Sequence, residues 1–101
     1  MIETATTIEK VVLAGLITQD QDENQAKEYL DELEFLADTA GASVLKKFLQ
    51  RIDRPHPVTF VGQGKLSEIA EYVKVSEADT VIFDDELTPT QLRNIEKVLE
   101  C

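Results

Sequence analysis

The sequence predicts an α/β fold: a small, mainly parallel sheet of three strands flanked by three helices. Three short apolar runs, at 10–17, 43–52 and 80–84, have the length and composition of strands. Stretches with apolar residues at helical spacing follow each run, so strand and helix alternate along the chain. This alternation is typical of parallel strands joined by right-handed crossover connections. A length of 101 residues suits one domain, which we place at 1–101.

Composition and charge limit the classes of function. The chain is 43% hydrophobic and 30% charged, which fits a folded globular protein. No apolar run approaches the ~20 residues that span a bilayer, and the N-terminus lacks the features of a secretory signal. Cys101 is the single cysteine, so we expect a reducing compartment, most simply the cytoplasm. The net charge of −10 argues against a sequence-blind binder of nucleic acid.

The first strand is a nearly unbroken apolar run, as expected for a strand covered on both faces. The acidic segment that begins at Asp20 has the opening spacing of a calcium loop. However, Gln25 stands in place of the turn glycine and Asp31 in place of the bidentate glutamate. We therefore expect no calcium, and interpret the acidic residues as the N-terminus of a helix, where the helix dipole favours them.

A long amphipathic helix is predicted over 23–40, with Gly41 in the left-handed position after its end. The strand that follows contains Lys46 and Lys47, which are adjacent and should point to opposite faces of the sheet. Such a pair favours an edge strand. The expected apolar face of the helix consists of Ala26, Tyr29, Leu30, Leu33, Leu36, Ala37 and Ala40.

The connection after the second strand is rich in residues that restrict the backbone. Pro55 and Pro57 favour extended neighbours, so we expect His56 to be held in an exposed extended segment. Phe60 and Val61 form a short apolar return toward the core. This connection is therefore the first place to search for a function beyond folding.

Two glycines flank Gln63 in a turn that we expect to lead into the second helix. Backbone amides at a helix N-terminus, beside a lysine, form a candidate anion site. The turn is not a Walker A motif, because Thr59 and Leu66 replace its first glycine and its magnesium-binding hydroxyl. The alternative that the glycines only turn the chain stays open. The anion-binding candidates are Gly62, Gln63, Gly64 and Lys65.

Basic residues concentrate between 46 and 65. This segment has five lysines and arginines against Asp53 alone, a charge of +4, which leaves −14 on the remainder of the chain. A basic strip on an acidic body can orient a charged partner. Solvated side chains on a strand and a loop would give the same pattern.

The third strand ends at Asp84 and Asp85, where α/β sheets usually place ligands. These two residues would carry a magnesium or phosphoacceptor site, but a receiver domain needs five strands and this chain has room for three. We therefore assign no metal site. The third helix begins with a capping box, in which Thr88 is the N-cap, Pro89 follows at N1 and Gln91 is at N3.

The chain stops at Cys101 before the apolar face of the third helix is complete. We expect the N-terminal piece of a longer protein, with a fourth strand missing by truncation. A missing strand would expose a sheet edge, so we also expect self-association of the isolated domain.

Three blocks of sequence together resemble the N-terminal domain of the HflX GTPases, over roughly residues 8–99. They are Thr39-Ala40-Gly41, the segment from Gln50-Arg51 to Lys65, and the segment from Val81 to Glu96. The combination of four motifs is specific to this family: Arg54-Pro55, Gly62-x-Gly64-Lys65, Phe83-Asp84-Asp85-Glu86-Leu87 and Gln91-x-Arg93-Asn94.

The resemblance implies an N-terminal, non-GTPase accessory domain of a longer ribosome-associated GTPase. Such a protein binds the large ribosomal subunit and helps to split stalled or stressed ribosomes. GTP and magnesium would bind a separate later domain, so this chain alone is not expected to be an enzyme or to hold a cofactor. Alternatives are a nucleotide- or anion-binding domain, or a structural domain that regulates the GTPase domain.

The implied partners are the RNA of the large ribosomal subunit and the GTPase domain of the same chain, with no membrane. The resemblance does not assign RNA contacts residue by residue, so the candidates come from the basic strip and the third helix. They are Lys46, Lys47, Arg51, Arg54, His56, Lys65 and Arg93.

Overall fold

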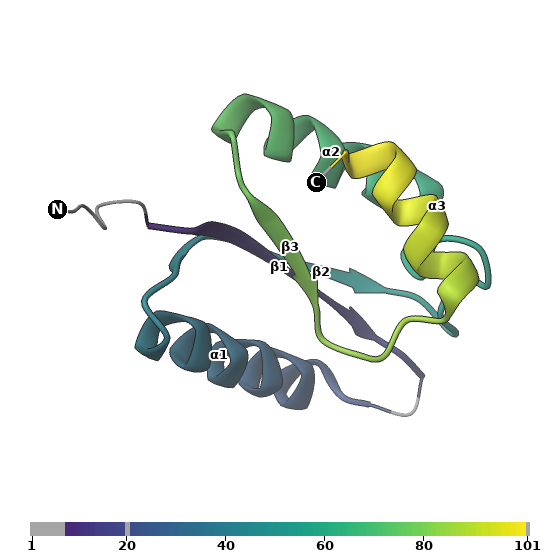
Figure 1. The fold of residues 1–101 in the computed structure, drawn as a ribbon. Coiled ribbons are helices and arrows are strands. Elements are labelled where there is room, and N and C mark those ends of the chain that lie inside the picture. The colour runs from purple at the N-terminus through teal and green to yellow at the C-terminus, as the bar shows by residue number, and fades with distance from the viewer. Residues whose placement is uncertain (1–7, 20, 101) are drawn as a thin grey trace, which may run out of the picture.

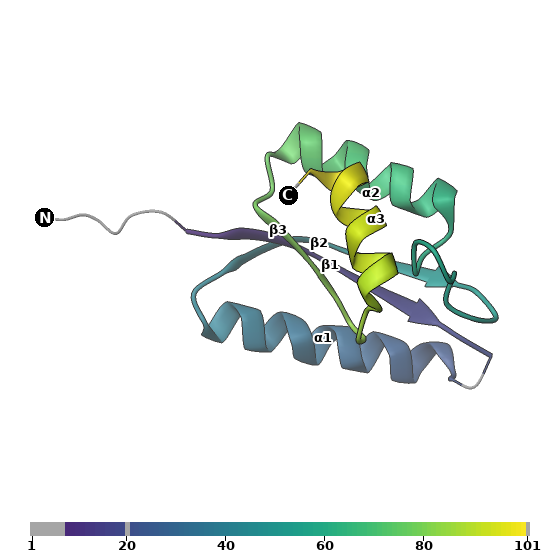
Figure 2. The same ribbon diagram turned by 45° about the vertical axis from the view of Figure 1, so that its right-hand side comes forward.

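The computed structural model describes residues 8–19 and 21–100, and confirms the predicted alternation of strands and helices. All strand pairs are parallel and the order is β2-β1-β3. Helix α1 covers one face of the sheet, and α2 and α3 cover the other (Figures 1 and 2). The elements are β1 (Lys10–Ile17), α1 (Glu23–Thr39), β2 (Ser43–Arg51), α2 (Gln63–Ser76), β3 (Thr80–Phe83) and α3 (Pro89–Leu99).

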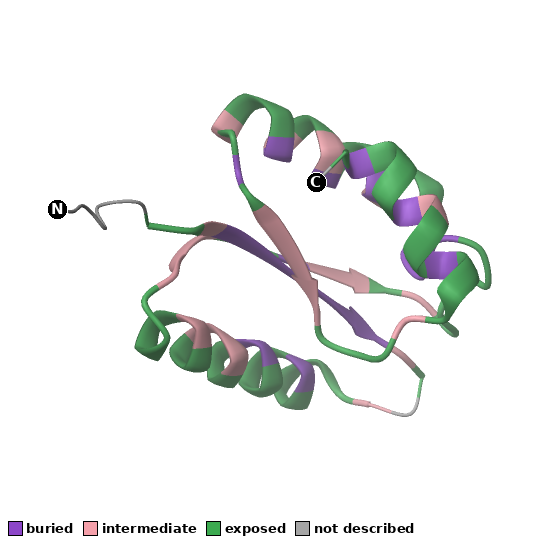
Figure 3. Cartoon of the chain, viewed as in Figure 1, coloured by how far each residue is buried: buried purple, intermediate pink, exposed green. Residues whose placement is uncertain are grey.

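Strand β1 is the centre of the sheet and is buried along most of its length, as its unbroken apolar run predicts (Figure 3). Its side chains alternate between two cores. Val12 and Ala14 belong to the larger core under α2 and α3, and Val11 and Leu13 belong to the smaller core under α1. The outer strands β2 and β3 are less buried because each has one free edge in the described sheet.

Strand β2 contains one extra residue relative to β1. Val11 pairs with Val44 and Val12 pairs with Lys46, so Leu45 lies in a bulge between them. Beyond the bulge the side chains alternate regularly, and the two adjacent lysines point to opposite faces of the sheet, as predicted.

Asp22 is the N-cap of helix α1, and its side chain accepts from the Gln25 amide at 2.7 Å. It ends in a Schellman motif, in which Gly41 has φ +94° and the Ala42 amide donates to Ala37 at 3.0 Å. The predicted apolar face is too wide. Ala26 and Leu30 are buried, but Tyr29, Leu36 and Ala40 are exposed, because a three-stranded sheet covers a narrower stripe of the helix.

Helix α2 begins two residues earlier than the glycine turn predicts. Gly62 is its extended N-cap, with φ −60° and ψ 153°, and Gln63 and Gly64 lie in its first turn. The first strand has its predicted bounds, whereas the second and third were predicted one residue too long, since β2 ends at Arg51 and β3 at Phe83. None of the described helices combines the length and apolar character that crossing a membrane requires.

The start of α3 agrees with the predicted capping box. The Thr88 side chain accepts from the Gln91 amide at 3.1 Å, and the Gln91 side chain accepts from the Thr88 amide at 2.9 Å. Pro89 occupies the first helical position, where its missing amide is not needed.

Candidate functional site

The sheet divides the predicted basic strip between its two faces. On the α1 face, the Lys47 ammonium lies 2.7 Å from Asp31 Oδ1 and 2.7 Å from Glu34 Oε1, and Arg51 lies 3.1 Å from Glu23 Oε1. The hydrogen bonds to Asp31 and Glu34 raise the pKa of Lys47. Both basic groups are therefore already engaged by carboxylates of this helix.

On the opposite face, two lysines converge on one aromatic ring. The Lys46 ammonium lies 5.0 Å from the ring centroid of Phe48, and the Lys65 ammonium lies 6.0 Å from it. Tyr72 packs edge-on against Phe48 at 5.8 Å and lies 5.1 Å from Lys46. We call these four residues the Phe48 cluster. It joins β2 to the first turns of α2 and offers cationic groups held by aromatic rings.

Lys65 in this cluster is also 3.2 Å from Glu68 Oε1, one turn further along α2. The carboxylate of Glu68 is well exposed, so this is a surface pair of small energy. Such a pair leaves the lysine able to exchange its partner for a stronger anion.

The connection between β2 and α2 is a closed loop and not the predicted extended segment. The amide of His56 donates to Phe60 and the amide of Phe60 donates to His56, both at 2.8 Å. The His56 Nδ1 atom accepts from the amides of Val58 at 3.1 Å and Thr59 at 3.4 Å. Because Nδ1 is an acceptor, the neutral imidazole carries its proton on Nε2. His56 is half-buried, whereas Arg54 is exposed.

Helix α3 holds this loop from the outside. The Gln91 Nε2 atom donates to the carbonyl of His56 at 2.8 Å, and the Asn94 side chain donates to the carbonyl of Val58 at 3.3 Å. The ring of Phe60 packs edge-on against Phe83 of β3 at 5.6 Å. Gln91 is only 5% exposed, so both ends of its amide group are used inside the protein.

The turn predicted to bind anions is partly occupied by the protein itself. The Gly62 backbone amide donates to Gln50 Oε1 at 2.8 Å. A Cβ atom at Gly62 would lie 3.0 Å from the side-chain nitrogen Nε2 of Gln50. Gly62 therefore permits close packing against β2. Gln63, Gly64 and Lys65 form the first turn of α2, which has no side-chain cap.

The two acidic residues after β3 lie elsewhere. Asp84 and Asp85 line a hollow of about 370 Å³ at the carboxyl ends of β1 and β3, together with Thr18, Gln21 and Tyr29. Asp84 is an exposed residue, but partial burial of its carboxyl group raises its pKa, and the nearby carboxylates of Asp85 and Glu32 raise it further. Within the described residues, no three His, Cys, Asp or Glu side chains are grouped to hold a metal ion.

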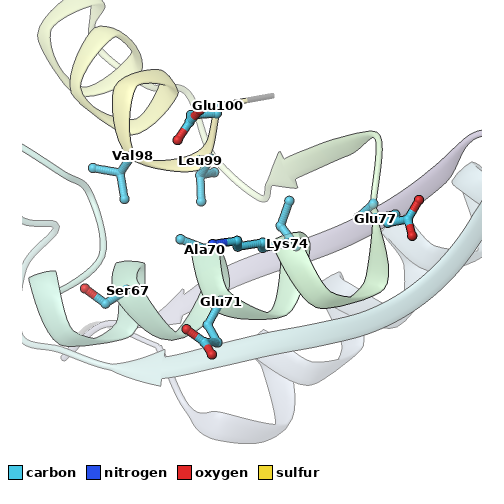
Figure 4. Close-up of a pocket in the computed structure, with 10 residues that line it drawn as sticks. Ser67, Ala70, Glu71, Lys74, Glu77, Val98, Leu99 and Glu100 are labelled. Carbon is cyan, nitrogen blue, oxygen red and sulfur yellow. The ribbon is translucent and has the colours of Figure 1, made fainter.

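Two other hollows flank α3. One of about 320 Å³ lies between β3 and α3 and is lined by Ile82, Phe83, Leu92 and Ile95 among others. The second, of about 520 Å³, lies between the C-terminal halves of α2 and α3, where Lys74 and Val98 face it (Figure 4). The exposed faces of Leu92 and Val98 make this side of the domain partly apolar.

Arg93 is an exposed residue of α3, between Leu92 and Asn94. The structure thus brings Lys46 and Lys65 together, places Lys47 and Arg51 on the other face, and leaves Arg54, His56 and Arg93 on the loop and α3.

Sequence reasoning missed the residues that connect these elements, namely Gln50, Phe48, Tyr72, Gln91 and Asn94. Gln91 and Asn94 were visible as part of the family signature, and Gln91 as a capping residue. Nothing in the local sequence showed that both also hold the loop at 54–60.

A family model and several known proteins match this chain, and all of them point to the same family of GTPases. Residues 27–101 match the family model described as GTP-binding GTPase N-terminal. The chain is 51% identical over 102 residues to a GTPase HflX of Flavobacterium psychrophilum, covering 100% of this chain and 25% of the relative.

Two further relatives carry the same name. The chain is 42% identical over 100 residues to GTPase HflX of Lacrimispora saccharolytica, covering 99% of this chain and 23% of the relative. It is 44% identical over 94 residues to GTPase HflX of Escherichia coli, covering 92% of this chain and 21% of the relative. The chain thus spans about a quarter of the length of these curated relatives.

Proposed function

Because the chain belongs to the HflX family of GTPases and matches its N-terminal domain, we propose that it is a ribosome-binding accessory domain. In this proposal an HflX-type GTPase uses the domain in the cytoplasm to bind the large ribosomal subunit and to assist ribosome splitting or recycling. GTP hydrolysis, with magnesium, belongs to a separate domain of the same protein. The contribution of this chain is binding.

The Phe48 cluster is the observation that carries this proposal. Two ammonium groups converge on one ring, and neither lies within 4 Å of the acidic face of α1. Lysine supplies the charge that neutralises phosphate. The loop with Arg54 and His56 connects β2 to α2, which are the two elements that carry the cluster. This arrangement suits an RNA backbone on a protein whose remaining surface is strongly acidic.

Charge reversal tests the proposal in the intact GTPase. Arg54→Glu combined with Lys65→Glu should weaken co-sedimentation with large ribosomal subunits and lower the salt slope by about 2, as expected for two lost phosphate contacts. Lys27→Glu combined with Lys74→Glu is the matched control, because it changes the net charge equally outside the strip. Equal binding and equal salt slopes for both variants would show that the basic strip does not contribute to ribosome binding.

Two neighbouring lysines provide a finer comparison. Lys46→Gln removes a charge of the Phe48 cluster, whereas Lys47→Gln removes one already paired with Asp31 and Glu34. We expect Lys46→Gln to weaken ribosome binding more than Lys47→Gln does. Equal losses would mean that the whole strip, and not one face of it, meets the ribosome.

A second candidate function is regulation of the GTPase domain of the same chain. The observation that favours it is the partly apolar side of α3, where Leu92 is 46% exposed and Val98 is 44% exposed beside the two hollows. GTP hydrolysis measured without ribosomes, with and without this domain, tests it. An unchanged rate would exclude regulation by intramolecular packing.

The uncapped first turn of α2, with Lys65, supports the alternative of anion or nucleotide binding. Calorimetry of the isolated domain with ATP or GTP and magnesium examines it directly. Absence of both binding heat and a shift in melting temperature would dismiss this alternative.

A further inference from the structure

We infer that the loop from Arg54 to Phe60 is a preorganised recognition element for RNA phosphate, and that Gln91 positions it. In this inference, His56 donates to a phosphate oxygen through Nε2, while Nδ1 accepts from the two loop amides. The inference rests on the proposed ribosome-binding function and adds how one part of that surface works.

The loop is closed by hydrogen bonds between its own residues. Two backbone hydrogen bonds of 2.8 Å join His56 and Phe60, and the His56 ring accepts from two amides inside the loop. Phe60 has φ +66°, which is a strained conformation for a residue with a large side chain. It persists because Phe60 is buried and packs against Phe83.

The loop is also tied to α3 by a buried side chain. Gln91 accepts from the Thr88 amide through Oε1 and donates to the His56 carbonyl through Nε2. One buried side chain therefore caps a helix and holds a loop 35 residues away in sequence. Asn94 adds a second donor one turn later, to the Val58 carbonyl. Because the loop is already held in place, binding a partner costs less conformational entropy.

The closed loop presents a hydrogen-bond donor and a guanidinium group. The bonds to Nδ1 leave Nε2–H as the donor of the His56 ring, two residues after the exposed guanidinium of Arg54. A hydrogen bond from Nε2–H acts at short range, in contrast to the long-range attraction of the Phe48 cluster.

This contrast gives a specific test with Gln91→Glu in the intact GTPase. Glutamate is a normal capping-box residue, so the start of α3 is kept, but it cannot donate to the His56 carbonyl. Thr90→Glu is the matched control, because it adds the same charge one residue away at an exposed position. Hydrogen exchange at 54–60 should rise in Gln91→Glu and not in Thr90→Glu.

Co-sedimentation with large ribosomal subunits across a salt series completes the test. Relative to Thr90→Glu, Gln91→Glu should bind about five-fold more weakly or worse at every salt concentration, with an unchanged salt slope. His56→Asn separates the donor from the positioning, since asparagine can still accept from the amides two and three residues on. It should keep exchange at 54–60 low and still weaken binding.

The outcomes distinguish the inference from the proposed function. If the Arg54 and Lys65 reversal weakens binding but Gln91→Glu and His56→Asn do not, the strip binds RNA and the loop does not contribute as inferred. If none of these variants weakens binding, both ideas fail. Unchanged loop exchange in Gln91→Glu would show that Gln91 does not position the loop. Asn94→Asp, which removes the second donor, provides the same measurement if Gln91→Glu does not fold.

Discussion

Asp84 shows how one side chain near the sheet edge affects stability. Burial raises its pKa first, and the carboxylates of Asp85 and Glu32 add to the effect. The folded state therefore binds this proton more tightly than the unfolded chain does. Stability is lost as pH rises from about 4, the ordinary carboxyl pKa, through the raised value.

Asp84→Asn should remove this loss. We expect the variant to be at least as stable as the natural sequence at neutral pH, with a smaller decline in the free energy of unfolding above about pH 4. Urea unfolding over a pH series measures both quantities. Glu86→Gln is the control for removing a nearby exposed carboxylate. An equal pH dependence in Asp84→Asn and the natural chain would contradict the assignment.

At the same scale, Gln91 marks how far sequence reasoning reaches. Its position three residues after Thr88 predicted the capping box, because capping depends on local spacing. Its bond to His56 joins distant parts of the chain and depends on how α3 packs on the sheet. The closed form of the loop was missed for the same reason, since prolines alone favoured an extended path.

Helices and strands follow from periodicity, whereas the width of a buried face does not. The apolar spacing in α1 identified the helix, but the sheet beneath it buries fully only Ala26 and Leu30 among the residues described for that helix. Tyr29 and Leu36 belong to the predicted face, but they are 46% and 56% exposed. The number of strands, and not the helix sequence, sets how much of the face is covered.

Leu30→Ala should therefore destabilise the chain strongly. Leu30 is 2% exposed in the smaller core with Val11 and Leu13, so a cavity there should cost about 2–5 kcal/mol. Leu36→Ala on the same helix removes a 56% exposed side chain and should change stability by less than about 0.5 kcal/mol. Chemical denaturation of both variants checks this, and similar losses would show that α1 packs differently.

For the whole molecule, alternation of strand and helix was sufficient to predict a parallel α/β domain. The strand order was not predicted, because it depends on which side of β1 each crossover returns to. The two faces of the sheet also divide the basic strip. Lys47 pairs with a carboxylate on the α1 face, whereas Lys46 lies against an aromatic ring on the other face. A fourth strand after α3 stays a prediction.

The isolated domain should self-associate. In the described sheet β3 pairs with β1 alone, and Leu92 beside it is 46% exposed. A free strand edge next to an apolar surface favours association. Light scattering over a concentration series should show a mass that rises above that of a monomer, and Leu92→Glu should reduce the rise. A constant monomer mass at high concentration would rule this out.

The bulge at Leu45 has a consequence for changes in chain length. A strictly alternating β2 would place Val44 and Lys46 on the same face, and one of them would be wrongly buried or exposed. The extra residue separates them, so Val44 reaches the smaller core while Lys46 reaches Phe48. Deleting Leu45 would restore simple alternation without moving either lysine to the other face. At this point β2 would keep its two chemically different sides with one residue fewer, but it would lose the packing of Leu45 against the larger core.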